Sequence, residues 1–210
     1  MSAEVLKAIK EQTEENDSLD ELVLDQIKFS KFTPEVVKAI EKIKGLSFLS
    51  LNDCGLTSLE GFPNLPSLIR CEVTDNKIPG SSLSHLAQST ELQSLSLGGN
   101  PINSIDDLKP LTTLTKIVQL DLFGCPVSEQ DDYREKVFAL FPNLQILDNK
   151  DAEGEEVEYD DEEGEDGEGD DDEGEDDEYE GDENGDDDEE EFDEDEEEED
   201  EKPKKKSKKQ

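Results

Sequence analysis

The sequence predicts an α/β solenoid with a curved parallel sheet, helical or irregular segments on its convex side, a cap at each end and a disordered acidic tail. Three observations predict this fold. Leucines recur with a period of 22 to 25 residues, which is typical of solenoids. Asn or Cys takes the same place in four repeats. The composition then changes abruptly, because 38 of the 61 acidic residues lie in 151–201, a segment without Lys or Arg.

The clearest repeat is Leu92-Gln-Ser-Leu95-Ser-Leu97-Gly-Gly-Asn100-Pro-Ile102, which fits the leucine-rich repeat pattern L-x-x-L-x-L-x-x-N-x-L. Similar units begin at residues 46, 68 and 117, and a weaker one begins at residue 19. Each unit predicts a short strand with inward leucines, so five stacked units build a parallel sheet. We therefore expect one leucine-rich-repeat domain with caps over residues 1–150.

One position after each strand is expected to hold the turns together, and it is occupied by Cys54, Asn76, Asn100 and Cys125. An amide both donates and accepts hydrogen bonds, so Asn can satisfy loop backbone that has no ladder partner, whereas Cys does so less fully. Cys71 takes an inward strand position. Because the cysteines are odd in number and form no Cys-x-x-Cys pair, we predict three buried, reduced thiols.

Caps must cover the leucines at both ends of an open stack. Apolar residues at helical spacing in segment 5–9 predict an N-terminal helix, and a second helix is predicted from its N-cap Thr33 to Gly45. Its predicted buried stripe consists of Val36, Val37, Ile40 and Ile43. At the other end, Asp132 and Glu135 predict a capping box that opens a helix through Leu140. A strand-like edge at 144–147 follows, before Asp148.

The formal net charge of −41 favours basic partners. Binding to duplex DNA needs a basic face and is not expected. Segment 151–201 cannot bury enough apolar surface to fold, so it is predicted to be a disordered clamp for basic proteins; the alternative is a merely solubilising polyanion. No apolar run is long enough to span a membrane, and no signal-peptide core follows Met1.

The basic end at 202–210 fits a nuclear-import signal that import receptors would read. Its lysines are Lys202, Lys204, Lys205, Lys206, Lys208 and Lys209. The alternative is a counter-charged plug that folds back on the acidic tail. Both can hold, with the plug hiding the signal until the tail is occupied.

Catalysis is not expected, and neither is a cofactor or metal site. His85 is the single histidine, it has no paired nucleophile in the sequence, and no Gly-x-Gly-x-x-Gly or P-loop motif occurs. The tail carboxylates lack the shaped, partly dry pocket that acid–base catalysis needs. The sequence therefore predicts a binding protein rather than an enzyme.

The outward strand positions predict a concave partner-binding face. Its charged and apolar members are Glu21, Val23, Asp25, Phe48, Arg70, Glu72, Asp121 and Phe123. The remaining outward positions are Ser50, Asn52, Thr74, Ser94, Ser96, Gly98 and Gln119. Exposed aromatics often anchor partners, although Phe48 and Phe123 can instead pack over neighbouring strands. This composition favours a basic protein segment as the partner.

These features together resemble the acidic leucine-rich nuclear phosphoprotein 32 family across the whole chain. The resemblance is closest at residues 119–127, 132–138 and 142–148. Its most specific element is the C-terminal cap of Tyr133 and Asp148. Two departures matter: segment 151–201 contains no Ser or Thr to be phosphorylated, and it has no apolar helix to select a histone variant. Acidophilic-kinase sites are instead predicted at Ser18, Ser104 and Ser128, each with an acid three residues later.

The resemblance implies nuclear, often shuttling proteins that bind core histones and shield them from acetylation or place them on DNA. It also implies inhibition of protein phosphatase 2A and a role as adaptor in messenger RNA export. Our leading hypothesis is a nuclear histone-binding chaperone or chromatin regulator that acts through its acidic tail and concave face. The alternatives are a regulator of protein phosphatase 2A and a nucleocytoplasmic transport adaptor.

Overall fold

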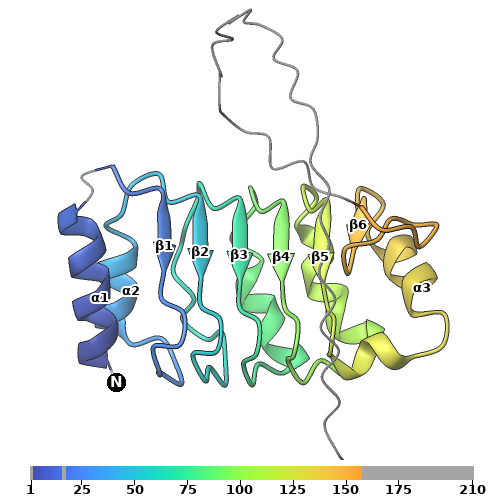
Figure 1. The fold of residues 1–210 in the computed structure, drawn as a ribbon, viewed down its shortest axis with the longest axis horizontal. Helices are drawn as coiled ribbons and strands as arrows, with labels where there is room; N and C mark the ends of the chain where they lie inside the picture. The colour runs from blue at the N-terminus through green and yellow to red at the C-terminus, as the bar shows by residue number, and fades with distance from the viewer. Residues whose placement is uncertain (1, 16–17, 158–210) are drawn as a thin grey trace, which may run out of the picture. The chain divides into compact units, whose positions relative to one another are not determined.

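Six short parallel strands form one sheet in sequential order β1-β2-β3-β4-β5-β6 (Figure 1). This computed structural model describes residues 2–15 and 18–157. The predicted acidic tail beyond residue 157 and the basic end at 202–210 lie outside the described residues. The strands are β1 (Glu21–Val23), β2 (Phe48–Ser50), β3 (Arg70–Glu72), β4 (Ser94–Ser96), β5 (Gln119–Asp121) and β6 (Ile146–Leu147). The predicted parallel sheet is confirmed.

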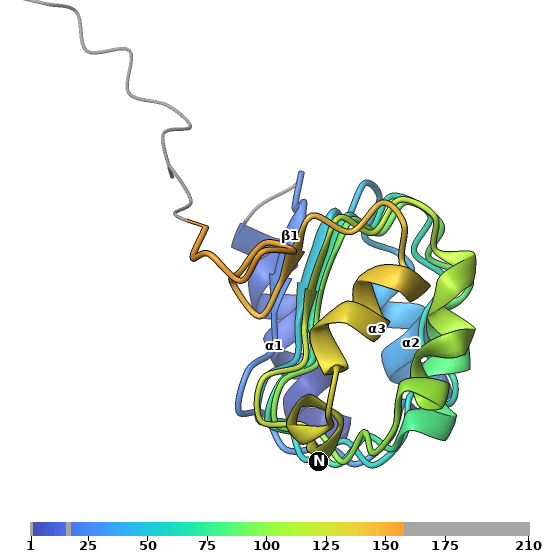
Figure 2. The same cartoon turned by 90° about the vertical axis from the view of Figure 1, so that its right-hand side faces the viewer.

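The strand register places one buried apolar residue of each repeat beside its counterpart in the next. This column consists of Leu22, Leu49, Cys71, Leu95, Leu120 and Leu147, and each side chain is fully buried. A second layer of short helices packs on the other side of these residues (Figure 2). The core therefore lies between the sheet and the convex segments, as expected for a solenoid in which each unit buries its neighbour.

The convex segments after β3, β4 and β5 are 3-10 helices: η1 (Gly80–Leu86), η2 (Ile105–Thr113) and η3 (Pro126–Glu129). Apolar residues occur at every third position through η2 and its C-cap, at Ile105, Leu108, Leu111 and Leu114, and they face the core or its edge. This spacing matches three residues per turn, whereas an α-helix would rotate the stripe out of the core. None of the helices in the described residues is long and apolar enough to cross a bilayer.

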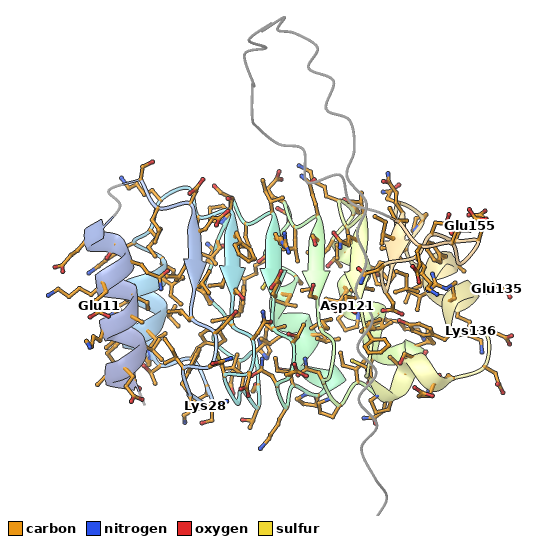
Figure 3. The ribbon with its side chains drawn as sticks, in the orientation of Figure 1. Glu11, Lys28, Asp121, Glu135, Lys136 and Glu155 are labelled. Atoms are coloured by element: carbon orange, nitrogen blue, oxygen red, sulfur yellow. The ribbon has the colours of Figure 1, made fainter. Side chains whose placement is uncertain are left out.

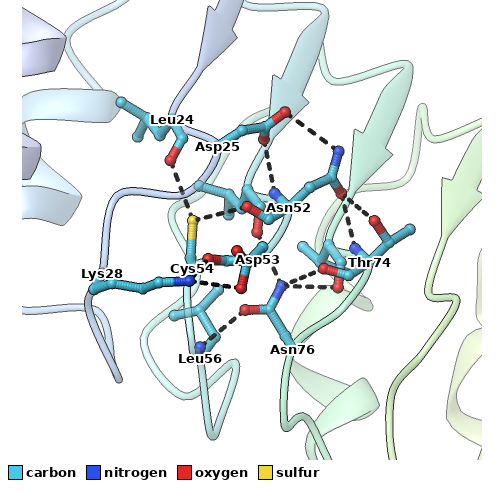
Figure 4. A network of polar contacts seen from close by, with 11 residues as sticks. Leu24, Asp25, Lys28, Asn52, Asp53, Cys54, Leu56, Thr74 and Asn76 are labelled. Atoms are coloured by element: carbon cyan, nitrogen blue, oxygen red, sulfur yellow. Dashed lines mark hydrogen bonds and ion pairs between the residues drawn. The ribbon is translucent and has the colours of Figure 1, made fainter.

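Two asparagines confirm the predicted role of the position after the strand. The side chain of Asn76 donates from Nδ2 to the carbonyl oxygens of Leu51, Val73 and Thr74 at 2.9, 3.0 and 2.9 Å. Its Oδ1 accepts the N–H of Leu56 at 2.9 Å (Figure 4). Asn100 repeats this arrangement one unit later, with three carbonyl partners and the N–H of Ile78. Each amide thus joins two adjacent turns.

The three cysteines are free and buried, as predicted. The thiols of Cys54 and Cys125 donate to the carbonyl oxygens of Leu24 and Leu97, at 3.2 and 3.3 Å. A thiol sulfur is a weaker acceptor than an amide oxygen, so it satisfies backbone N–H groups less fully than Asn does. Burial is the main cause that raises the pKa of Cys54 and Cys71 to about 12 and that of Cys125 to about 11. These thiols are structural and poor nucleophiles at neutral pH.

The N-terminal cap contains two helices side by side, α1 (Ser2–Glu15) and α2 (Pro34–Ile40) (Figure 1). The edge strand β1 is closed by a side chain rather than by another strand. Gln12 donates from Nε2 to the carbonyl of Val23 at 2.7 Å, and its Oε1 accepts the N–H of Val23 at 3.1 Å. This primary amide imitates a peptide group at an edge that would otherwise be open to pairing.

The second helix is shorter than predicted. It ends at Ile40, before a turn that includes Ile43, and Gly45 follows with a left-handed φ of 82°. Thr33 does take the N-cap position, but its hydroxyl makes no capping hydrogen bond. Val36 and Ile40 are buried, whereas Val37 and Ile43 are half-buried at the edge of the core. The predicted buried stripe is therefore confirmed for Val36 and Ile40, whereas Val37 and Ile43 are only partly buried and Ile43 lies beyond the helix.

The C-terminal cap contains α3 (Tyr133–Leu140), and its helix bounds agree with the prediction. The capping box of Asp132 and Glu135 is wrong, because Asp132 has a left-handed backbone (φ 58°) and makes no side-chain cap bond. A capping box needs an extended backbone at its first residue. The cap that forms instead joins Tyr133 to Asp148: the hydroxyl donates to Oδ2 at 3.0 Å, while Oδ1 accepts the backbone N–H of Leu122, the residue after β5, at 2.7 Å.

The described chain continues past residue 150 as a small turn that closes the last strand. Leu147 and Lys150 exchange backbone hydrogen bonds at 2.8 and 3.1 Å. The Arg134 guanidinium donates to the carbonyl oxygens of Leu147, Lys150 and Asp151 at 3.1, 3.3 and 2.7 Å. Residues 151–157 therefore belong with the cap rather than with the acidic segment in which their composition placed them.

We predict that Asn100→Ala lowers the free energy of unfolding by about 2–4 kcal/mol, because it leaves buried carbonyl and N–H groups without partners. Urea unfolding followed by circular dichroism measures this loss. Asn103→Ala is the matched control, since its exposed side-chain amide bonds to a single described partner, the carbonyl of Pro101. Equal effects of the two substitutions would contradict the proposed role of the buried amide.

We also predict that stability falls as pH rises above about 9. The native thiols stay protonated up to pH 11–12, whereas unfolded thiols ionise near their ordinary pKa of 9.0. The unfolded state therefore binds fewer protons in this window, at about 1 kcal/mol per pH unit for each thiol. Urea titrations at pH 8, 9 and 10 should show a shallower decline for Cys71→Ala than for the wild type. Parallel declines would show that the thiols do not cause it.

Candidate functional site

The outward strand positions form one face of the sheet, which we call the concave face. Glu21, Val23, Arg70 and Phe123 are exposed on it. Half-buried members are Asp25, Phe48, Asn52, Glu72, Thr74, Ser94, Ser96, Gln119 and Asp121. Ser50 and Gly98, two of the predicted outward positions, are buried. The carboxylate of Asp25 covers Ser50, and that of Asp121 covers Gly98. These residues are buried because of contacts between neighbouring strands, which the alternation along one strand does not predict.

At the N-terminal half of the concave face, Phe48, Arg70 and Glu72 form one stacked unit. The guanidinium carbon of Arg70 lies 5.1 Å from the centre of the Phe48 ring. Nε and Nη2 of Arg70 also donate to Oε1 of Glu72 at 3.0 and 2.6 Å. Phe48 therefore packs over its neighbour, as one of the two alternatives predicted. The positive charge of Arg70 is matched by a carboxylate within the face.

A polar network joins the first three units of the concave face, at β1, β2 and β3 (Figure 4). Oδ1 of Asp25 accepts from the Ser50 hydroxyl at 2.6 Å and from the Asn52 N–H at 2.7 Å. Asn52 continues the network by donating to Glu72 at 2.9 Å and accepting from the N–H and hydroxyl of Thr74 at 2.9 and 2.7 Å. Fully satisfied networks of this kind are rigid, so this part of the face is preorganised.

The C-terminal half of the concave face is open. Phe123 is 77% exposed. It lies two residues after Asp121, which belongs to β5 and is labelled in Figure 3. The Asp121 carboxylate accepts the N–H of Phe123 at 3.0 Å and has no ion pair among the described residues. Gly98 provides the room, because a Cβ there would lie 3.1 Å from Asp121 Oδ2. The carboxylate of Asp121 and the exposed ring of Phe123 therefore lie on the same face, and Asp121 packs against the backbone of Gly98.

Electrostatic repulsion makes this half of the face receptive to cations. Burial raises the pKa of Asp121, and the nearby carboxylates of Asp148, Glu72 and Asp75 raise it further, while its bond with the Phe123 N–H acts in the opposite direction. A cation placed here would offset the repulsion between Asp121 and these carboxylates. The arrangement suits binding of basic and apolar groups.

His85 is exposed on η1, and no group of three or more His, Cys, Asp or Glu in the described part of the chain could hold a metal ion.

The candidate phosphorylation sites differ in accessibility. Ser18 is exposed. Ser104 is half-buried and forms the capping box of η2 with Asp107, whose Oδ2 accepts the N–H of Ser104 at 3.0 Å. Ser128 donates to the carbonyl of Cys125 at 2.8 Å. Asp107, the acid three residues after Ser104, therefore has a structural role. The spacing S-x-x-D is typical of a capping box as well as of a kinase site.

Gln12 and Arg134 are structural residues that sequence reasoning missed. Both close a sheet edge by bonding to backbone more than ten residues away. No local motif marks either one. Glu135, assigned to the C-terminal cap, is exposed, and the six lysines of the predicted import signal lie outside the described residues.

Known proteins with similar sequences and folds agree with this architecture. The leucine-rich repeat family matches residues 19–168. A protein of Tetrahymena thermophila that is named as a histone is 42% identical over 159 residues, which cover 74% of this chain and 40% of that protein. Acidic leucine-rich nuclear phosphoprotein 32 family member A of Drosophila melanogaster is 40% identical over 142 residues, which cover 68% of this chain and 52% of that protein. The chain thus spans about half or less of the length of these curated relatives.

A solved structure shares the fold. A chain in the crystal structure of the Drosophila melanogaster SNF/U2A' complex superposes with a TM-score of 0.53 at 29% identity, covering 62% of this chain and 73% of that one. The chain therefore belongs to the leucine-rich repeat family, and its predicted similarity to the acidic leucine-rich nuclear phosphoprotein 32 proteins is confirmed.

Proposed function

We propose that this protein is a nuclear histone-binding chaperone or chromatin regulator that acts without catalysis. The observation that carries the proposal is the charge of the concave face. Its outward positions hold four carboxylates, Glu21, Asp25, Glu72 and Asp121, against the single guanidinium of Arg70. Because Glu72 already neutralises Arg70, the face offers net negative charge to a partner. Core histones present the complementary basic surface.

The acidic segment would supply most of the affinity. It holds 38 acids in residues 151–201, and such a density of charge attracts basic proteins quickly and in a salt-sensitive way. The concave face would supply orientation, since Phe123 gives an exposed aromatic anchor beside Asp121. Affinity and specificity thus reside in different parts of the chain.

The names of the relatives support the same proposal. The Tetrahymena thermophila relative contains a region 42% identical to this chain, so this kind of repeat domain occurs in a protein named as a histone. Other relatives are named nuclear phosphoproteins, which supports a nuclear location. The basic end at 202–210 would bind import receptors. Shuttling to the cytoplasm remains part of the proposal.

Deletion of residues 158–201 should weaken binding to core histones by about a hundredfold at 0.15 M salt, because the main electrostatic attraction is lost. The deletion starts after residue 157 because residues 151–157 bond to the C-terminal cap. Fluorescence anisotropy with labelled histones measures affinity, and an unchanged Tm shows that the domain is folded. Undiminished binding by the truncated chain would refute the division of labour. Inhibition of protein phosphatase 2A that survives high salt would favour the phosphatase alternative instead.

The double substitution Asp121→Asn with Phe123→Ala should weaken histone binding by roughly five- to twentyfold with little loss of stability, since both groups reach the open half of the concave face. Asp106→Asn is the charge-matched control, because Asp106 lies exposed on η2 and, among the described residues, pairs with Lys109 at 2.8 Å. The same anisotropy titration compares the three proteins. If the control is as weak as the double variant, net charge alone governs binding.

A further inference from the structure

The N-terminal cap contains a groove that the proposed function does not use. It lies between α1 and α2 and has a volume of about 440 Å³, which is within the usual range of ligand pockets, about 300–1,000 Å³. Its apolar lining consists of Leu6, Ile9, Leu19, Ala39 and Ile43. We call this hollow the cap groove. Figure 1 shows the two helices that flank it, beyond β1 and away from β3 to β6.

The apolar lining exceeds what a simple cap requires. The terminal unit of a solenoid stays soluble because its outer side is polar. Here Leu6, Leu19 and Ile43 are only half-buried, with part of each packed against the core and part lining the groove. Apolar surface that remains open in a concave hollow is typical of a binding site for an apolar side chain.

The rim of the cap groove is basic although the domain is acidic. Lys10, Lys42 and Lys44 line it, and no Asp or Glu occurs among its described lining residues. By contrast, residues 1–150 contain 23 acidic and 14 basic residues. Lys10 pairs with Glu14 across 3.4 Å at the surface, a contact that is weak and easily exchanged. Lys42 and Lys44 form no ion pair with a described residue, so two ammonium groups remain available.

From this charge complementarity we infer that the cap groove docks an acidic amphipathic helix of a partner protein. The apolar side chains of that helix enter the hollow between α1 and α2, and its flanking Asp or Glu carboxylates pair with the lysines. Amphipathic helices bind grooves in this way through residues three and four apart. A basic histone segment is excluded because the lysines repel it. The concave face and the cap groove therefore select partners of opposite charge.

The test uses the full chain at 0.15 M salt and a fluorescein-labelled, 18-residue helical peptide of Leu, Glu and Asp with leucines along one face. Lys42→Glu with Lys44→Glu should weaken peptide binding at least about tenfold, because two attractions become repulsions. Lys31→Glu with Lys77→Glu is the matched control, since it changes net charge equally at exposed lysines that do not line the groove. The control should change affinity less than about twofold. Equal losses in the two double variants overturn the inference.

Further measurements separate a specific groove from general attraction. A peptide of the same composition with its leucines spread around the helix should not bind, and methyl NMR shifts should centre on Leu6, Ile9 and Ile43. Binding of the scrambled peptide, shifts centred on Val23, or vesicles of phosphatidylserine that bind with the same lysine dependence would each overturn the proposal. Asp121→Asn with Phe123→Ala should leave peptide binding intact. Failure of the cap groove therefore does not affect the histone proposal, and failure of the histone proposal does not affect the cap groove.

Discussion

Satisfying the buried backbone where the chain leaves the sheet is the constraint on which this structure depends. Strands of two or three residues pair few peptide groups, so the following turn enters the core with carbonyl and N–H groups that no strand can bond. Asn76 and Asn100 bond these groups across neighbouring units. Cys54 and Cys125 satisfy only the carbonyl side. The column of turns therefore fixes the register, which in turn aligns the leucines beneath the sheet.

The same register creates the functional surface. Because each outward residue lies beside its counterpart in the next unit, side chains far apart in sequence become neighbours along the concave face. Asp25 and Ser50, or Phe48 and Arg70, meet only for this reason. In the N-terminal half, polar side chains such as Asp25, Asn52 and Glu72 bond to one another. In the C-terminal half, the carboxylate of Asp121 and the ring of Phe123 are available to a partner. A rigid half and an open half of one sheet suit a surface that orients a partner bound chiefly by charge.

The two ends solve the problem of open sheet edges differently, and this difference produces the asymmetry of the domain. At the first strand, Gln12 supplies one amide in place of a peptide group, and the two flanking helices leave the cap groove between them. At the last strand, Tyr133, Arg134 and Asp148 bind the chain directly and leave a closed edge. The groove of the N-terminal cap is therefore lined by lysines and by no acidic residue among the described ones, although the domain as a whole is acidic.

The sequence by itself determined the features that repeat: the strand positions, the Asn and Cys column, the buried thiols and the sudden change to an acidic segment. These are periodic or compositional, so they can be read locally. Tertiary structure alone decided the burial of Ser50, the left-handed turn at Asp132, the helix end at Ile40 and the edge closure by Gln12. Ser50 and Gln12 bond to partners 25 and 11 residues away, separations that no local pattern encodes. The helix end and the left-handed turn are backbone conformations that apolar spacing does not specify. The sequence therefore predicted which residues form the concave face. It did not predict which of their side chains remain free to bind a partner.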